Sequence, residues 1–163
     1  MNNAYVDSVL AQCRLELAHV QTSIGALGFI SDVSPYLTKY AVIRACGTIE
    51  VCFKTIIADF CSRKSKKQLK HYIERKVTQS STNPSFENIL NLLGQFDVSW
   101  KNSFKLRVDG EPDKVNLRSS LQSLVDARNE FAHGGNPTLT ISDIINHFDN
   151  ARRVLEHLDQ VVA

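Results

Sequence analysis

Apolar residues recur at helical spacing over most of this 163-residue chain. In residues 4–28, steps of four and three alternate, which keeps the side chains on one face of an α-helix. The stripe consists of Val6, Leu10, Cys13, Leu17, Val20, Ile24 and Leu27. Such a stripe is typical of a helix packed on its own core, and also of a helix that pairs with a second copy of the chain. The pattern alone leaves both alternatives open.

Residues 37–62 are apolar over most of the helical surface, which predicts a central helix. The apolar positions are Ala41, Val42, Ala45, Ile49, Cys52, Phe53, Ile56, Ile57 and Phe60. Two charged residues, Arg44 and Glu50, interrupt this pattern. Each either points outward at an edge of the helix or takes part in a buried ion pair.

Two short helices are predicted next. Asn83-Pro84 reads as an N-cap followed by proline at the first helical position. The inner face of that helix consists of Phe86, Ile89, Leu90 and Leu93, and the helix is expected to end near Gly94. Residues 97–108, with Trp100, Phe104 and Leu106, are predicted to form the second short helix.

The last two predicted helices are long. The first begins between residues 112 and 116 and ends at His133 or Gly134, before a loop at 134–138. The second begins near Thr140 or Ser142. Its inner face consists of Ile144, Ile145, Phe148, Ala151, Leu155, Leu158 and Val162. Since strand alternation and internal repeats are missing, residues 1–163 are predicted to form one all-α, single-domain helical bundle of four long and two or three short helices.

Composition narrows the class of protein further. Hydrophobic residues make up 43% of the chain and charged residues 22%, which is typical of soluble globular proteins. No stretch approaches the ~20 apolar residues of a membrane span, and residues 1–5 lack the features of a secretory signal. The four cysteines lie among apolar neighbours, so they are expected to be buried free thiols in a reducing cytoplasm: Cys13, Cys46, Cys52 and Cys61.

The net charge of +2 hides a strongly basic segment at residues 63–76, which holds seven Lys or Arg and one acid, Glu74. As a helix, this segment would have a weak apolar side and a cationic side. The apolar side would consist of Leu69, Tyr72, Ile73 and Val77. The cations are either a solvated face or a phosphate-binding patch. The predicted RNA-binding residues are Arg63, Lys64, Lys66, Lys67 and Lys70.

Arg128 is a charged residue at an apolar position of its predicted helix. It continues the apolar stripe of Leu117, Leu121 and Leu124, so its guanidinium must reach solvent, find a partner or serve a function. Candidate partners are Glu50 and Asp126. Five residues later, His133 precedes two glycines, where the helix would end with unpaired carbonyls. Two interpretations remain for this pair of residues. Either His133 only caps the helix, or Arg128 and His133 both have a catalytic role.

Other catalytic signatures are missing from the sequence. It contains no glycine-rich phosphate loop, no HExxH or CxxC pair, and no GxSxG. Asp143 and His147 have the i, i+4 spacing of metal ligands, but two ligands are too few for a site. Neither a metal nor another cofactor is therefore expected.

Residues 128–133 read RNEFAH and are followed by Gly134-Gly135, and this motif resembles that of the HEPN superfamily. The run at residues 47–50, the Asn83-Pro84 pair and residues 140–143 resemble the RiboL-PSP type of HEPN domain. The resemblance implies a cytoplasmic, metal-independent RNA endonuclease whose active site contains Arg128 and His133, with Asn129 at the polar position of the motif. It also implies a homodimer that joins two copies of the site in one cleft. Relatives of this kind act in toxin–antitoxin, anti-phage or stress systems, so a cognate antitoxin is an expected partner.

The residue types suit metal-free RNA cleavage, which needs a base, an acid and a cation for the phosphate. Histidine exchanges protons near neutral pH, and arginine offers a fixed cation with a fork that matches two phosphate oxygens. Asn129, at i, i+4 from His133, is expected to orient the imidazole or contact phosphate, while Glu130 is expected to face solvent. The alternatives are a non-catalytic HEPN module that binds nucleotide, RNA or a protein, and a structural domain that dimerises through residues 4–28.

Overall fold

The computed structural model describes residues 1–27, 31–136 and 138–162, and within these ranges it is helical with no strand. The helices are α1 (Ala4–Leu27), α2 (Ser34–Ser62), α3 (Lys67–Ile73), the π-helix η1 (Glu74–Thr78), α4 (Phe86–Phe96), α5 (Val98–Asp109), α6 (Lys114–Ala132) and α7 (Ile141–Val162). The prediction of an all-α bundle with four long and two or three short helices is confirmed, since the described residues form four long and three short α-helices. The predicted end of the first helix at residue 28 lies outside the described residues.

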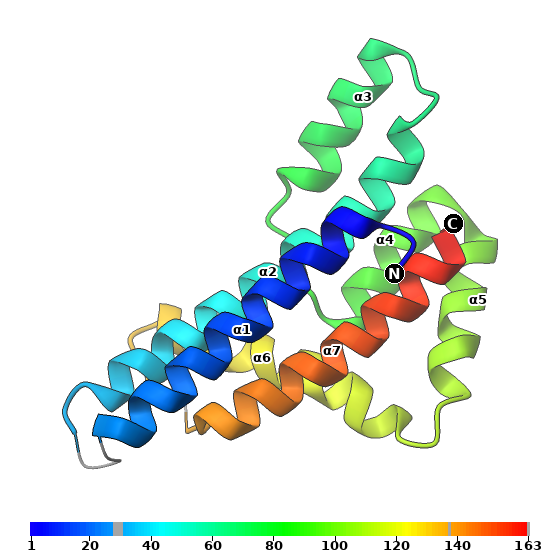
Figure 1. Cartoon of the computed structure of the whole chain (residues 1–163). Helices are drawn as coiled ribbons and strands as arrows, with labels where there is room; N and C mark the ends of the chain where they lie inside the picture. Colours follow the sequence, from blue (N-terminus) through cyan, green and yellow to red (C-terminus); the bar gives the residue numbers. More distant parts are fainter. Residues whose placement is uncertain (28–30, 137, 163) are drawn as a thin grey trace.

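Helix α7 holds the bundle together, because it packs against α6, α2, α1 and α5. Its predicted inner face, from Ile144 to Val162, is buried throughout. Helices α1 and α2 lie side by side (Figure 1). The end of α2 joins α3 and η1 in a projection that we call the arm, residues 58–78, which extends away from the bundle (Figure 1). No helix among the described residues is long and apolar enough to cross a membrane.

The apolar stripe of α1 belongs to the core of the chain. Six of its seven members, from Val6 to Ile24, are at most 8% exposed, while Leu27 is 51% exposed. Because these six side chains are already covered within one protomer, the structure excludes them as a seam between two copies. The prediction for Leu27 is wrong because it lies in the last turn of α1, beyond the packed part of the bundle.

Helix α2 is less completely buried than its sequence predicts. It begins three residues early, with proline in its first turn. Its inner residues are buried, but Tyr36, Tyr40, Ile43 and Val51 are each at least 45% exposed. Arg44 pairs with Glu16 of α1 at 2.5 Å, at the edge of the helix.

The four cysteines are free thiols. Cys13, Cys46 and Cys52 are buried, while Cys61 is only half-buried, so the expectation of burial fails for that residue. Burial raises the pKa of Cys46 to about 11 and that of Cys52 to about 12. Thiols that are protonated in this way are poor nucleophiles near neutral pH.

The basic segment is not one continuous helix. Residues 63–66 form a turn, and α3 then passes into η1. Of the four expected apolar contacts, Ile73 and Val77 are buried against Ala58 of α2, but Leu69 and Tyr72 are exposed. The arm is only two helices thick, so α2 covers one column of side chains and leaves the rest in solvent.

The short helices differ from prediction mainly at their ends. Ser85, not Asn83, caps α4, because its hydroxyl accepts from the Asn88 amide at 3.3 Å. Asn83 instead accepts from the Asn88 side chain at 2.6 Å. Helix α4 also continues past Gly94 to Phe96. Its four predicted inner residues are buried as expected.

In α5, Phe104 is buried, whereas Trp100 is half-buried and Leu106 is 75% exposed. Leu106 lies two residues beyond Phe104, a step that turns it to the far side of a helix. Of the three apolar residues named for this helix, Leu106 therefore faces solvent.

Candidate active site

The end of α6 fixes the position of His133. His133 is the C-cap, Gly134 has φ +84°, and the Gly135 amide donates to the Glu130 carbonyl at 2.9 Å. The Gly134 amide donates to the Phe131 carbonyl at 3.0 Å, which completes a Schellman motif. A Cβ at Gly135 would lie 2.6 Å from the Glu130 side chain. Both glycines are thus needed for this sharp helix end, which leaves His133 exposed.

Arg128 lies at the point where the buried stripe of α6 reaches the surface. Its side chain is 39% exposed, and its Nη2 donates to Glu50 Oε2 of α2 at 3.3 Å. Its Nη1 donates to the side-chain oxygen of Asn129 at 3.2 Å. Asp126, the other candidate partner, accepts from Gln122 at 2.7 Å. Arg128 therefore has both a fixed partner and access to solvent, so part of its guanidinium is available to a ligand.

A buried lysine completes this ion-pair group. Lys54 is 2% exposed, and its ammonium donates to Glu50 Oε1 at 2.6 Å and to the carbonyl of Ser80 at the base of the arm. Glu50 thus holds Lys54 with one oxygen and Arg128 with the other. A buried ammonium requires such compensation. Lys54 was not predicted from the sequence, although its i, i+4 spacing from Glu50 in an apolar helix indicates a possible ion pair.

Lys39 is a second cation near the motif that the sequence did not reveal. Its ammonium lies 5.4 Å from the centre of the Phe131 ring, within the RNEFAH run, and 5.8 Å from that of Tyr36. Both distances are in the range of cation–π contacts. Arg128 also lies close to Cys46 and lowers the pKa of that thiol, but burial is the larger effect and raises it. The candidate reactive groups are therefore Arg128 and His133, with Lys39 at the edge of the site.

The basic segment lies apart from the motif. Arg63 and Lys64 are in the turn at the tip of the arm, and the three lysines follow in and just before α3, all exposed. Thirteen positions of α2 separate Arg63 from Glu50, which is about 20 Å at 1.5 Å per residue. The structure therefore joins Arg128 and Asn129 by a hydrogen bond and places His133 five positions after Arg128, at the end of α6. The predicted RNA-binding residues lie on a separate, exposed part of the molecule.

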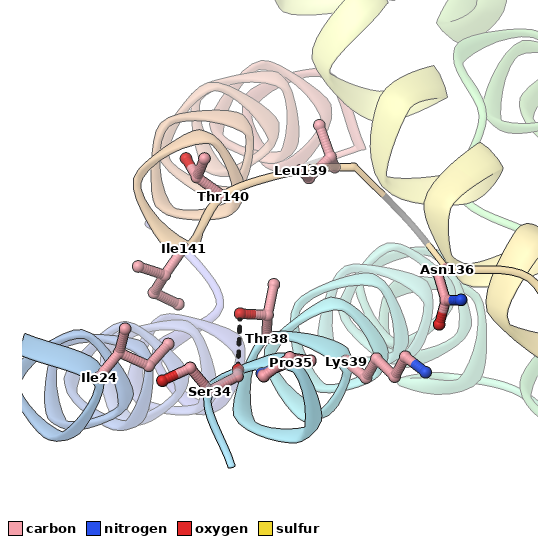
Figure 2. A pocket seen from close by; sticks show the side chains of 9 residues that line it. All are labelled: Ile24, Ser34, Pro35, Thr38, Lys39, Asn136, Leu139, Thr140 and Ile141. Atoms are coloured by element: carbon pink, nitrogen blue, oxygen red, sulfur yellow. Dashed lines mark hydrogen bonds between the residues drawn. The ribbon is translucent and has the colours of Figure 1, made fainter. Parts of the chain in front are cut away.

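A cavity of about 520 Å³ opens between the start of α2 and the segment that leads into α7. Lys39 and Asn136 lie at one end of it, and Ile24 and Ile141 at the other (Figure 2). Its lining includes neither the arginine nor the histidine of the motif. Lys39 connects the cavity to the end of α6 through its contact with Phe131.

A serine–histidine contact elsewhere has a structural role. Ser120 Oγ lies 3.1 Å from His147 Nδ1 and accepts from Asn150 at 2.9 Å, but Ser120 is only 2% exposed in the α6–α7 interface. A substrate cannot reach it. Asp143 is held by Thr140 in a capping box, and burial lowers the pKa of His147. Among the described residues, no three His, Cys, Asp or Glu side chains group as metal ligands.

Comparison with known proteins identifies the family. Residues 8–163 match the family model described as RiboL-PSP-HEPN, which covers all of the candidate site. Searches of curated proteins and of solved structures gave no match.

Proposed function

This chain belongs to the RiboL-PSP-HEPN family, and on that premise we propose that it is a metal-independent RNA endonuclease with Arg128 and His133 in its active site. The observation that carries the proposal is the end of α6, where a Schellman helix end presents an exposed histidine five residues after a partly exposed arginine. Side chains on a fixed helix end are well placed to hold a phosphate in one orientation. The family also supports a setting in a toxin–antitoxin, anti-phage or stress system.

The reaction we propose is an attack of the ribose 2′-oxygen on the adjacent phosphorus. His133 accepts the 2′-hydroxyl proton as the new P–O bond forms, and the P–O5′ bond breaks as the 5′-oxygen takes a proton from an acid. Arg128 stabilises the charge that develops on the phosphate oxygens. The products are a 2′,3′-cyclic phosphate and a 5′-hydroxyl.

One protomer supplies only part of this chemistry. The base and the acid act on opposite sides of the phosphorus, and each protomer offers one such histidine. A two-fold dimer would supply two histidines and two arginines, so that the partner's His133 can serve as the acid. We therefore propose a homodimer with a composite site.

The test uses purified protein, RNA and excess EDTA. We expect cleavage to persist in EDTA and to give cyclic-phosphate and 5′-hydroxyl ends, because the nucleophile belongs to the RNA itself. An oligonucleotide with a single ribose should be cut only after that ribose, and an all-deoxy version should not be cut. Cleavage of the all-deoxy strand, or a strict need for a divalent metal, would rule out the proposed mechanism.

We propose that the arm binds RNA through its exposed cations. Reversing three of them, in the variant Lys66→Glu/Lys67→Glu/Lys70→Glu, should weaken RNA binding. It should also flatten the dependence of log K on log salt, by about 0.7 for each phosphate of a single strand that the protein no longer neutralises. Fluorescence anisotropy at several salt concentrations measures both effects.

The control for this variant is Lys105→Glu/Lys114→Glu, because both lysines are exposed on other helices. It should leave the slope unchanged. If the arm variant also keeps the wild-type slope, the cations of the arm are a solvated face.

A second candidate function is a non-catalytic module that binds a nucleotide. The cavity beside Lys39 favours it, since about 520 Å³ lies within the usual size range of small-molecule sites. The amine of Lys39 can pair with a phosphate, and the amide of Asn136 can hydrogen-bond a base. Saturable nucleotide binding without any RNA product in the assay above would favour this function over the nuclease.

A further inference from the structure

The cations of the arm are not neutralised by neighbouring acids. Of the seven Lys and Arg in residues 63–76, none forms an ion pair within the described part of the chain. The arginines of the bundle differ, because six of them pair with carboxylates: Arg14, Arg44, Arg118, Arg128, Arg152 and Arg153. The arm therefore carries an unbalanced positive charge, which attracts a polyanion.

Two large apolar side chains lie uncovered among these cations. Leu69 is 49% exposed and Tyr72 is 60% exposed, and their spacing of three positions makes them neighbours on the surface of α3. Among the described residues, the side chain of Tyr72 takes part in no hydrogen bond and no ring contact. The ring is thus open to a ligand on the arm, which projects from the bundle (Figure 1).

The π-helix that follows α3 supplies two cations next to this ring. Arg75 and Lys76 come three and four positions after Tyr72, within about one helical turn, and both are exposed. Ile73 and Val77 are buried in one column against α2, so the residues between them face solvent. Single π-helical turns are frequent at functional sites. Tyr72 is therefore an exposed aromatic ring with cations beside it along the helix.

We propose that Tyr72 stacks on a base of single-stranded RNA, while the cations around it pair with the adjacent phosphates. The inference rests on the proposed RNA binding by the arm, and it adds which part of the RNA the arm recognises. Exposed aromatic rings combined with cations are typical of proteins that bind single strands. Every base has a flat face, so stacking of this kind holds a strand whatever its sequence.

Duplex RNA does not suit this ring. The bases of an A-form helix are already stacked on one another, and its major groove is too deep and narrow for side chains to read. On a duplex, the ring of Tyr72 would meet riboses and phosphates instead of base faces. In a single strand or a loop the base faces are open, so the ring and a base can exclude water from each other.

The test measures binding of a single RNA strand of about 12 nucleotides by fluorescence anisotropy. Every ribose of the strand is 2′-O-methylated, which removes the hydroxyl that the proposed cleavage uses, so binding is measured without cleavage. We expect Tyr72→Ala to raise the Kd about 5- to 150-fold, the effect of losing one stacked base. Tyr72→Phe keeps the ring and should bind as the wild type does. Tyr72→Leu keeps an apolar side chain without a ring and should bind almost as weakly as Tyr72→Ala.

The salt dependence separates stacking from charge. Tyr72→Ala should keep the wild-type slope of log K against log salt, because it removes no phosphate contact. Its affinity for a 2′-O-methylated duplex of the same sequence should also be unchanged. The control is Leu106→Ala, which removes an exposed apolar side chain from α5 and should bind the single strand as the wild type does.

The outcomes separate this inference from the nuclease proposal. If Tyr72→Ala binds the single strand as tightly as the wild type, or loses equal affinity for strand and duplex, Tyr72 does not stack on a base. If the wild type does not bind the strand, the inference fails together with RNA binding by the arm. A loss confined to the single strand and restored in Tyr72→Phe supports the inference, even if the wild type never cleaves RNA. In that case the nuclease proposal fails alone.

Discussion

Replacing His133 with alanine should leave a folded protein that cleaves RNA at least a hundredfold more slowly than the wild type. General acid–base groups typically contribute about 10²–10⁴ to a rate, and in a composite site the substitution removes both the base and the acid. The side chain is exposed at a helix C-cap whose geometry is set by Gly134 and Gly135. The free energy of unfolding should therefore change by less than about 0.5 kcal/mol. Single-turnover cleavage and urea unfolding measure the two quantities.

The control is His19→Ala, at an exposed position of α1. It should cleave RNA at the wild-type rate, which excludes a general effect of losing a histidine. If the His133→Ala protein cleaves RNA as fast as the wild type, the assignment of His133 to the active site is wrong. If His133→Ala loses both cleavage and dimerisation, the residue acts in forming the dimer. Sedimentation of the same variant therefore accompanies the cleavage assay.

Breaking the ion pair between Glu50 and Lys54 should have the largest effect on stability. In Glu50→Leu, the ammonium of Lys54 stays 2% exposed without its counter-charge. Removing one member of a buried pair typically costs about 3–5 kcal/mol. Lys54→Met leaves the carboxylate to Arg128 and should cost less. Equilibrium urea unfolding gives the free energies, and a double-mutant cycle gives the coupling.

The double variant Glu50→Leu/Lys54→Met separates stability from positioning. Apolar side chains of similar volume can replace a buried pair with little loss, so its unfolding free energy should return toward that of the wild type. Its cleavage rate should stay low, because Arg128 has lost the carboxylate that holds it. A double variant with full stability and full activity would contradict the positioning role of Glu50.

A half-buried pair with the same spacing, more exposed than Glu50 and Lys54, serves as the control for this cycle. Glu156 accepts from Arg152 at 3.2 Å in α7, with both side chains at least one-third exposed. Glu156→Leu should cost less than about 1 kcal/mol, because solvent already screens that pair. A similar cost for Glu50→Leu would mean that Lys54 is hydrated or uncharged in the folded protein.

Helical periodicity predicted most of the bundle, because its apolar stripes are long and uninterrupted. The inner faces of α1, α4 and α7 were predicted correctly except at Leu27, in the last turn of α1. Apolar character alone does not decide burial where no neighbouring helix covers the position. Leu69 and Leu106 are apolar but exposed, since no second surface covers them. The spacing of apolar residues shows which face of a helix they share, but not whether another helix covers that face.

The candidate site was predictable in part. Arg128 and His133 stand out along α6, because a charge that continues an apolar stripe and a histidine before two glycines are both unusual. The contact between Arg128 and Glu50 joins residues 78 positions apart, so it was only one of two alternatives in the sequence. Lys39 could not be predicted, because Phe131 comes near it only in the folded chain. For Lys54, the spacing from Glu50 was visible in the sequence, but its burial and its contact with Ser80 were not.

The central position of α7 affects the order in which the site can form during synthesis. Helix α7 is made after α6, yet it packs against α6, α2 and α1 together. A nascent chain that stops before residue 141 therefore lacks the helix that packs on both α6 and α2, and the contact between Arg128 and Glu50 has less support. Contacts between distant segments form late because their loop-closure entropy must first be overcome. An enzyme that cuts RNA would thus stay inactive on the ribosome while its own message is being read.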